Sequence, residues 1–544
     1  MPRILILWVL LLPVCSRSQV DLPGGPNAIP TARQRAWQDL GLGMFVHFAP
    51  NTWQDREYDD LSTPLQDINP ARLDTDQWAD TAARMGAKYI VFVAKHAGGF
   101  CMWQTGTTDY SIRSTPWRGG KGDIVADLAA SCRKRGIKLG LYLSPQDARH
   151  GAGNGGRCKT AEAQEAYNDL YRRQLTELLS NYGEITEIWF DGSVAVPVGD
   201  ILRRFAPGAM IFQGPHATIR WVGNEQGFAP YPAWNALPAR DARTGIATAM
   251  HGDPDGDVWM PNEVDVSLRR PNWFWSTKNH IRIMTLDQLM EIYYRSVGRG
   301  ANLLLNLTPD RSGLIPEADI ARVEEFGREV RRRFGRSLAE THGSGKTLEL
   351  KLKAPARIDH VILQEDIRRG ERIREYVVEG KTQEKWMRLG GGSAIGQMRV
   401  QPVEPTAVEG LRLRITQAAG TPQIRRLAAF ATGSPPPKTW DDPPRVWADD
   451  AAGRWANGQV DLDLTRRIDA ATQYRLRFVP EGGGPAGISE AEVLLDGVAQ
   501  PDLLRPENGR SDSLLLTIPA TGHKVQLRAR MQVAGSGTVL IQKR

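Results

Sequence analysis

The chain has 544 residues, which is enough for roughly three to four domains, one of them with a large hydrophobic core. Hydrophobic residues make up 41% and charged residues 24%, as in an ordinary globular protein, which excludes wholesale disorder and a fibrous fold. The net charge is +7, from 69 basic and 62 acidic residues, but no basic stripe is interleaved with aromatic residues. The sequence therefore argues against nucleic-acid binding.

The N-terminal segment predicts a signal peptide over residues 1–18. Arg3 precedes an apolar run over 4–14, and Ser16 and Ser18 supply small residues for a cleavage site. The run is too short to span a bilayer, although an uncleaved anchor is the alternative. No other stretch is apolar enough to cross a membrane. We therefore expect an exported protein, periplasmic or secreted, with no integral membrane segment after signal removal.

Helical and strand-like patterns alternate from 31 to 340. The expected strands are 42–48, 87–94, 137–143, 185–190, 209–213, 219–223, 247–250 and 301–306, and the expected helices are 76–85, 123–135, 160–181, 285–297 and 317–333. Near-continuous apolar strands separated by amphipathic helices indicate a parallel sheet covered by helices. About eight strands favour a (β/α)8 barrel as the catalytic domain over an open, doubly wound sheet.

Beyond residue 345 the pattern changes to short alternating strands. Those over 348–353, 359–366, 374–380, 411–416 and 426–432 predict a β-sandwich domain that spans 345–433. A proline-rich stretch over 433–444 is typical of a stiff linker. Short strands resume in 445–544, at 474–479, 491–496, 513–518, 524–531 and 538–542, and they predict a second β-rich domain.

Polar and aromatic residues stand where five of the expected barrel strands end. They are His47, Lys95 with His96, Tyr142 with Ser144, Asp191 and Asn306. In barrels of this type the loops at the carboxyl ends of the strands converge on one face, and catalytic groups sit there. The sequence therefore predicts a functional site on that face.

Two carboxylates are candidates for chemistry. Asp191 follows Trp189 and Phe190 at a strand end, where partial desolvation would tune a carboxylate for nucleophilic or acid/base work; a turn or helix-cap aspartate is the ordinary alternative. Glu225 lies between Gly223 and Gly227, which suggests a loop with unusual backbone angles, and an ordinary surface glutamate is the alternative. Two such carboxylates facing each other would suit glycoside hydrolysis.

His47 and His96 are isolated histidines without the spacing of metal ligands. The chain also has no glycine-rich phosphate loop and no dinucleotide-binding fingerprint. We therefore expect neither a metal nor a cofactor, and we interpret the two histidines as neutral hydrogen-bond partners of sugar hydroxyls.

Six blocks of the sequence, taken together and in order, resemble the family 29 glycoside hydrolases, the α-L-fucosidases. The blocks are 41–53, 86–103, 123–145, 182–192, 220–227 and 296–319. The stretch 362–380 resembles the β-sandwich of the plant-like members and extends the match to about residue 433.

The resemblance implies a retaining exo-glycosidase that releases terminal α-L-fucose from a fucosylated oligosaccharide or glycoconjugate. Asp191, in the motif WFDG, would be the nucleophile. Glu225, in WVGNE, would be the acid/base of the subgroup that favours α-1,3/1,4-linked fucose. The residues that would bind the sugar are His47, Glu57, His96, Tyr142 and Trp189.

One position departs from the family pattern. The family usually has a second histidine after the one matched by His96, and this chain has Ala97. A pocket that lacks one hydrogen-bond partner loses on the order of 1–3 kcal/mol unless another group replaces it. Either the sugar differs from fucose, as in an α-L-galactosidase or another L-sugar hydrolase, or another loop refills the pocket. A non-catalytic glycan-binding protein is the remaining alternative, against which both carboxylates argue.

Overall fold

The structure is a computed structural model that describes residues 28–242, 251–278, 283–383, 385–434, 450–468, 473–480, 487–506, 513–532 and 534–543. Three sequence expectations lie outside the described residues. They are the signal peptide over 1–18, the strand over 247–250 and most of the linker over 433–444.

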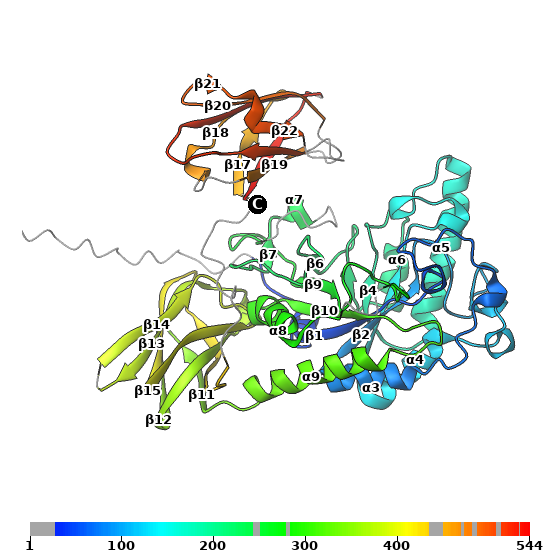
Figure 1. The fold of residues 1–544 in the computed structure, drawn as a ribbon, viewed down its shortest axis with the longest axis horizontal. Coiled ribbons are helices and arrows are strands. Elements are labelled where there is room, and N and C mark those ends of the chain that lie inside the picture. The colour runs from blue at the N-terminus through cyan, green and yellow to red at the C-terminus, as the bar shows by residue number, and fades with distance from the viewer. Residues whose placement is uncertain are drawn as a thin grey trace, which may run out of the picture.

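The first part of the chain forms a barrel of eight parallel strands (Figure 1). In hydrogen-bonded order they are β5 (Met210–Phe212), β4 (Ile185–Trp189), β3 (Lys138–Leu143), β2 (Tyr89–Lys95), β1 (Leu42–Val46), β10 (Asn302–Leu307), β9 (Asn262–Ser267) and β6 (Arg220–Trp221). A parallel bridge between Phe212 and Ile219 joins the two ends of the sheet. The expected (β/α)8 fold class is therefore confirmed.

The place of one barrel strand differs from the expectation. β9, rather than a strand over 247–250, lies between β6 and β10. Its side chains alternate: Val264 and Val266 pack into the outer core, whereas Glu263 and Asp265 lie on the inner face. Because two of its inward residues are carboxylates, β9 lacks the continuous apolar run by which buried parallel strands are recognised.

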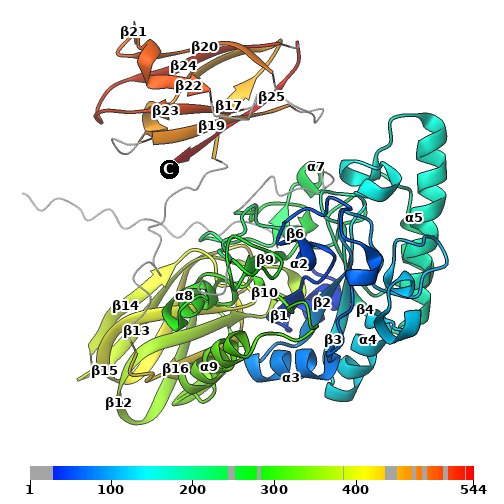
Figure 2. The ribbon, with the colours of Figure 1, turned by 45° about the vertical axis from the view of Figure 1, so that its right-hand side comes forward.

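Helices cover the outside of the barrel (Figure 2). In chain order, the helices of the described residues are α1 (Ala32–Gln38), α2 (Asn51–Gln54), α3 (Thr75–Met85), α4 (Ile124–Arg135), α5 (Ala161–Asn181), α6 (Gly199–Phe205), α7 (Ala239–Ala242), α8 (Leu286–Arg295) and α9 (Glu317–Phe334), and the longer ones form this cover. Asp74, Asp123 and Thr160 cap the N-termini of α3, α4 and α5 through their side chains. The five helices expected from the sequence match α3, α4, α5, α8 and α9 within a few residues.

The inside of the barrel is filled largely by aromatic side chains. Its apolar cluster includes Trp37, Phe45, Tyr89, Tyr142, Trp189 and Phe212. A separate and larger core lies between the strands and the helices. The interior cluster is a packed layer, as in other parallel barrels, and it forms the floor of any site at the carboxyl ends of the strands.

After α9 the chain forms a six-stranded antiparallel sheet. In order its strands are β11 (Ala339–Ser344), β16 (Gln423–Phe430), β12 (Thr347–Glu365), β15 (Arg399–Ala418), β13 (Ile373–Thr382) and β14 (Lys385–Gly392). The two strands expected over 348–353 and 359–366 are the halves of β12, which has a register shift against β15 between Lys351 and Ala356. Such irregularities let a strand bend, so that one strand contributes two segments to the same core.

The C-terminal part contains two further antiparallel sheets. One holds β17 (Asp450–Trp455), β25 (Gly537–Lys543), β19 (Gln473–Pro480), β23 (Ser513–Thr517) and β22 (Leu504–Pro506); the other holds β18 (Gln459–Asp463), β24 (Val525–Met531), β20 (Ile488–Leu495) and β21 (Val498–Ala499). Both sheets contribute to one apolar core. Each of the five expected strands in this part overlaps an observed strand.

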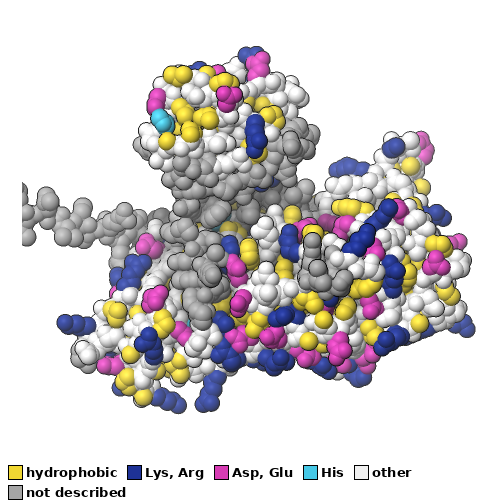
Figure 3. Space-filling model, viewed as in Figure 1, with side chains coloured by type: hydrophobic (Ala, Val, Ile, Leu, Met, Phe, Trp, Pro, Cys, Tyr) yellow, Lys and Arg dark blue, Asp and Glu magenta, His cyan; other side chains and the backbone are white. Residues whose placement is uncertain are grey.

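The surface carries both signs of charge. On the face shown in Figure 3, basic and acidic side chains are interspersed over the described residues. Within the described ranges, no helix is both long and apolar enough to span a bilayer.

Candidate active site

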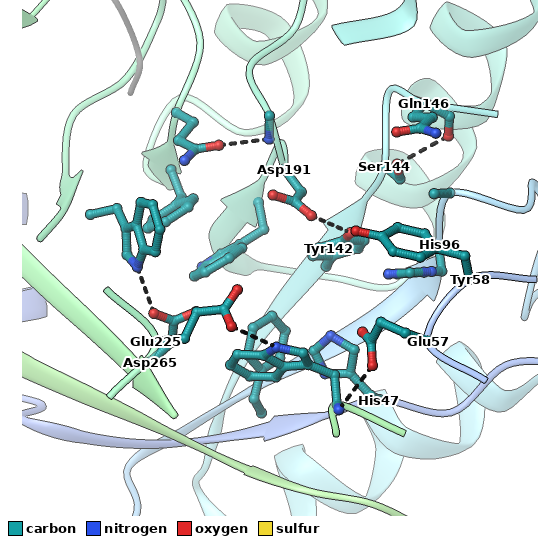
Figure 4. A pocket seen from close by; sticks show the side chains of 18 of the residues that line it. His47, Glu57, Tyr58, His96, Tyr142, Ser144, Gln146, Asp191, Glu225 and Asp265 are labelled. Carbon is teal, nitrogen blue, oxygen red and sulfur yellow. Dashed lines mark hydrogen bonds between the residues drawn. The ribbon is translucent and has the colours of Figure 1, made fainter. Parts of the chain in front are cut away.

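A cavity of about 510 Å³ opens at the carboxyl ends of the barrel strands. All seven site residues predicted from the sequence line it (Figure 4), namely His47, Glu57, His96, Tyr142, Trp189, Asp191 and Glu225. They come from six different segments of the chain, so the fold brings together residues that are almost 180 positions apart. Asn306, another strand-end residue, contacts the cavity lining through His47.

Asp191 lies two residues after the end of β4, at a turn that its neighbours fix. Gly192 has a φ of 72°, and a side chain there would clash with Asn154. The backbone N–H of Gly192 donates to Gln213 Oε1 at 2.8 Å, and the Tyr142 hydroxyl donates to Asp191 Oδ2 at 3.0 Å. Burial raises the pKa of Asp191, while the Tyr142 hydrogen bond favours its ionised form. The carboxylate is therefore held in one orientation toward the cavity.

Glu225 lies on the loop that follows β6. The flanking Gly223 and Gly227 have φ values of 91° and 75°, which confirms the unusual backbone expected from the sequence. The indole N–H of Trp273 donates to Glu225 Oε2 at 3.3 Å. Glu225 is exposed at the mouth of the cavity, where a leaving group and a water molecule would have access to it.

Glu57 comes from the loop after α2 and shares Trp273 with Glu225. The backbone N–H of Trp273 donates to Glu57 Oε2 at 3.2 Å. Burial, together with the charges of Glu225 and Asp191, raises the pKa of Glu57 to about 7. Near neutral pH Glu57 is therefore divided between a carboxylic acid and a carboxylate, and in either form it can hydrogen-bond a sugar hydroxyl.

His47 and His96 are buried and neutral. Burial lowers the pKa of His47 well below its usual value and lowers that of His96 to about 4. His47 Nδ1 lies 2.9 Å from Asn306 Oδ1, and the ring of His96 stacks on that of Tyr142 with centroids 5.9 Å apart. His96 Nδ1 is buried and has no hydrogen-bond partner among the described residues. A sugar hydroxyl in the cavity is the kind of partner that such a ring requires.

Trp189 forms part of the cavity floor. Its ring stacks on Phe212 with centroids 3.5 Å apart and an interplanar angle of 5°. Its indole N–H donates to Glu187 Oε1 at 2.7 Å and to Glu263 Oε1 at 2.9 Å. The only polar atom of the indole is thus bound below the cavity, and the small part of Trp189 that lines the cavity is apolar.

Ala97 and Tyr58, which come from different loops, both line the cavity. Tyr58 is 67% exposed, and its ring centroid lies 6.3 Å from that of His96. Partial burial and the nearby charges of Glu57 and Asp191 raise its pKa, so the phenol is a neutral donor close to the carboxylates. Tyr58 therefore adds a hydroxyl to the lining of the cavity, which the Ala97 side chain does not. The sequence signal was its position next to Glu57.

Asp265 is a fourth carboxyl group in the cavity and was missed by the sequence analysis. Its Oδ1 accepts a hydrogen bond from Trp221 Nε1 at 2.6 Å. Burial, and then the charges of Glu225 and Asp191, raise its pKa to about 8. At neutral pH it is therefore mostly a neutral acid. The missed signal was the alternation of carboxylates and valines in β9.

The lining of the cavity suits a neutral, hydroxyl-rich ligand. Aromatic faces, neutral imidazoles and carboxyl groups alternate around it. Across the described residues, no three histidine, cysteine or acidic side chains are grouped so that they could hold a metal ion. The geometry is that of a small sugar pocket with two carboxylates at its open side.

Comparison with known proteins agrees with this geometry. The family model for alpha-L-fucosidase matches residues 34–333. Alpha-L-fucosidase 1 of Arabidopsis thaliana is 33% identical over 452 residues, which cover 74% of this chain and 87% of the plant protein. The chain belongs to the alpha-L-fucosidase family. It is therefore a glycoside hydrolase.

Solved structures of this family share the fold. A putative alpha-L-fucosidase from Bacteroides thetaiotaomicron superposes with a TM-score of 0.70 at 33% identity and covers 74% of this chain and 99% of its own. A mutant of a Ruminococcus gnavus family 29 fucosidase, in complex with fucose, superposes with a TM-score of 0.67 at 26% identity and covers 76% of this chain and 96% of its own.

Proposed function

We propose that this family member is a retaining exo-α-L-fucosidase in which Asp191 is the nucleophile and Glu225 the general acid/base. The observation that carries the proposal is that both carboxylates lie in one cavity, each fixed by a different aromatic donor, Tyr142 or Trp273. Membership of the alpha-L-fucosidase family and the sugar-sized cavity support it.

The two steps follow from these positions. An oxygen of Asp191 attacks the anomeric carbon, the bond from that carbon to the leaving oxygen breaks, and protonated Glu225 gives its proton to the leaving oxygen. In the second step Glu225 takes a proton from water, the resulting oxygen attacks the anomeric carbon, and the bond to Asp191 breaks. The sugar is released with its original configuration, and both carboxyl groups return to their starting states.

Recognition of the sugar falls to the neutral groups around the two carboxylates. His47 and His96 remain uncharged at ordinary pH because burial lowers their pKa values. Glu57 and the Tyr58 phenol lie on one loop beside them. This set offers both donors and acceptors to the hydroxyls of a deoxy sugar, while the Trp189 face suits its apolar side.

Two candidate sugars, L-fucose and L-galactose, differ in the group at the sixth carbon. L-Galactose carries a hydroxymethyl group where L-fucose has a methyl group, and the small Ala97 in the cavity wall favours L-galactose as the second candidate. We place L-fucose first because Tyr58 supplies a hydroxyl to the lining of the same cavity and because of the family relationship. We extend the proposal to α-1,3/1,4-linked fucose because Glu225 stands in the WVGNE motif.

The test is a hydrolysis screen with purified protein. An aryl α-L-fucoside and an α-1,3/1,4-fucosylated oligosaccharide are compared with the matching α-L-galactosides, and Asp191→Ala is the control. Fucose release, chiefly from the oligosaccharide and absent in the variant, is the expected result. Galactose release would favour the second candidate. Sugar binding without release of either sugar would contradict the proposal and favour a glycan-binding protein.

We also propose that the protein is exported, on the basis of the apolar run over 4–14. The mass of the mature protein, purified from its native host, tests this. Loss of about 18 N-terminal residues is expected, and an intact N-terminus would contradict cleavage.

A further inference from the structure

Two fully buried glutamates lie in the barrel interior, directly beneath the sugar cavity. Glu187 on β4 and Glu263 on β9 are both 0% exposed. On β4 the two-residue period of a strand places Glu187 and Trp189 on the same inner face, and Asp191 follows two residues beyond Trp189, in the turn after the strand. The lower carboxyl pair is therefore joined to the candidate nucleophile by one short segment of strand. The proposed mechanism assigns it no role.

Glu187 has an indole donor at each of its oxygens. Oε2 accepts from Trp37 Nε1 at 2.6 Å, and Oε1 accepts from Trp189 Nε1 at 2.7 Å. An indole nitrogen donates and cannot accept a hydrogen bond. A proton on either oxygen of Glu187 would therefore compete with a short indole contact, and the ionised form fits this position.

Glu263 has different surroundings. Its Oε2 accepts from the Tyr89 hydroxyl at 2.7 Å, its Oε1 shares the Trp189 N–H, and a hydrogen bond joins its carboxyl group to that of Glu187. Two carboxyl groups can form such a bond only when one of them carries a proton. Burial and the charge of Glu187 raise the pKa of Glu263 well above its usual value. The pair thus holds a single proton, and that proton belongs on Glu263.

We propose that the anion of Glu187, hydrogen-bonded to a neutral Glu263, is the positioning device that fixes the Trp189 indole and, through β4, the orientation of Asp191. Neither glutamate touches the substrate, so both act as positioning residues. The inference deepens the proposed function and rests on it, because Asp191 matters here as the nucleophile.

The proposal predicts different results for two substitutions that each preserve the shape of the side chain, Glu263→Gln and Glu187→Gln. In Glu263→Gln, the amide oxygen accepts from Tyr89 and the NH2 group donates to Glu187. The NH2 group can no longer accept the Trp189 N–H at 2.9 Å, but that N–H keeps its nearer acceptor, Glu187 Oε1, at 2.7 Å. In Glu187→Gln, the NH2 group must face the N–H of Trp37 or of Trp189 at 2.6 or 2.7 Å, and two donors meet. We expect kcat on the aryl α-L-fucoside to fall between about 10-fold and 100-fold in E187Q and to stay within about threefold of wild type in E263Q.

A double variant distinguishes the meeting of two hydrogen-bond donors from a general loss of packing. Replacing Trp37 by Phe removes the indole N–H at Glu187 Oε2, so the amide of E187Q can turn its NH2 group toward the phenyl ring. The double variant E187Q/W37F should recover at least about fivefold in kcat over E187Q, or recover folding if E187Q does not fold. No recovery in either measure would overturn the proposal.

Glu177 on α5 provides a matched control. It accepts the indole N–H of Trp103 at 2.9 Å in the outer layer of the barrel. Glu177→Gln should lower the midpoint of thermal unfolding while leaving kcat and KM unchanged. Equal effects of E187Q and E177Q on kcat, or equal effects of E187Q and E263Q, would overturn the positioning role.

The near-ultraviolet circular dichroism of the tryptophans gives a readout that does not need turnover. The spectrum of E263Q should match that of the wild type, and the spectrum of E187Q should differ from both. If the wild type hydrolyses no α-L-fucoside, the proposed function fails. The difference between the spectra of E187Q and E263Q would still test whether an ionised Glu187 positions the Trp189 indole. Identical spectra for E187Q and E263Q would overturn it.

Discussion

Glu57 gives a test of the electrostatics of the cavity that does not depend on activity. Replacing it by Gln removes a carboxyl group whose pKa is raised from 4.5 to about 7 by burial and by the charges of Glu225 and Asp191. A shift of that size corresponds to about 3 kcal/mol in favour of the protonated form. Ionised Glu57 therefore destabilises the folded protein by about that amount.

The pH window follows from the direction of the shift. Between pH 4.5 and about 7 the folded chain holds a proton on Glu57 that the unfolded chain has already lost, so the free energy of unfolding falls as the pH rises. Above this window both states are ionised and the full penalty remains. Glu57→Gln removes the penalty, so the variant should gain stability relative to wild type from pH 5 to pH 8, by about 2–3 kcal/mol.

Urea unfolding of the barrel, followed by tryptophan fluorescence at pH 5 and at pH 8, measures this difference. Glu165→Gln, an exposed position on α5, is the control and should show no pH-dependent gain. The same E57Q variant should lose affinity for L-fucose, because it lacks the Glu57 carboxyl group that lines the cavity. A gain in stability that is equal at both pH values would refute the electrostatic reasoning.

Three further outcomes are expected. Lys95→Met should lower the free energy of unfolding by about 3–5 kcal/mol, because it leaves the Asp147 carboxylate without its ammonium partner where both side chains are 0% exposed; a loss below about 1 kcal/mol in urea unfolding would contradict this. Tyr58→Phe should lower kcat/KM for the α-L-fucoside about two- to tenfold through one lost hydrogen bond, and an unchanged value would exclude the phenol from sugar contact. Asp265→Asn should keep activity at pH 7 and flatten the fall in kcat/KM above pH 8, where Asp265 ionises; an unaltered alkaline limb would contradict that assignment.

The sequence predicted the barrel because its apolar strands and amphipathic helices have clear periods. It also predicted which strand ends carry the site, since the polar residues after β1, β2, β3 and β4 interrupt apolar runs. It missed β9 because Glu263 and Asp265 point into the barrel and break the apolar pattern. The hydrogen bonds of Glu263 to Tyr89 and Trp189 in this interior join residues more than 70 positions apart, and no local pattern reveals them.

The roles of Tyr58 and Trp273 were not predicted from the sequence, for a different reason. Both residues lie on loops, where side-chain direction depends on neighbours far away in the sequence. Trp273 binds Glu57 through its backbone and Glu225 through its indole, a double role that no motif encodes. The departure at Ala97 was visible in the sequence, but the presence of Tyr58 in the lining of the same cavity became visible only in the folded chain.

The most direct test of the central claim is to trap the glycosyl-enzyme intermediate. The protein is incubated with a 2-deoxy-2-fluoro-α-L-fucosyl donor, digested and mapped by mass spectrometry. We expect one fluorofucosyl group per chain, attached to the peptide that contains Asp191 and absent in Asp191→Ala. Labelling of another carboxylate, or turnover of natural substrate with inverted configuration and no label, would contradict the assignment of Asp191 as the nucleophile of a retaining enzyme.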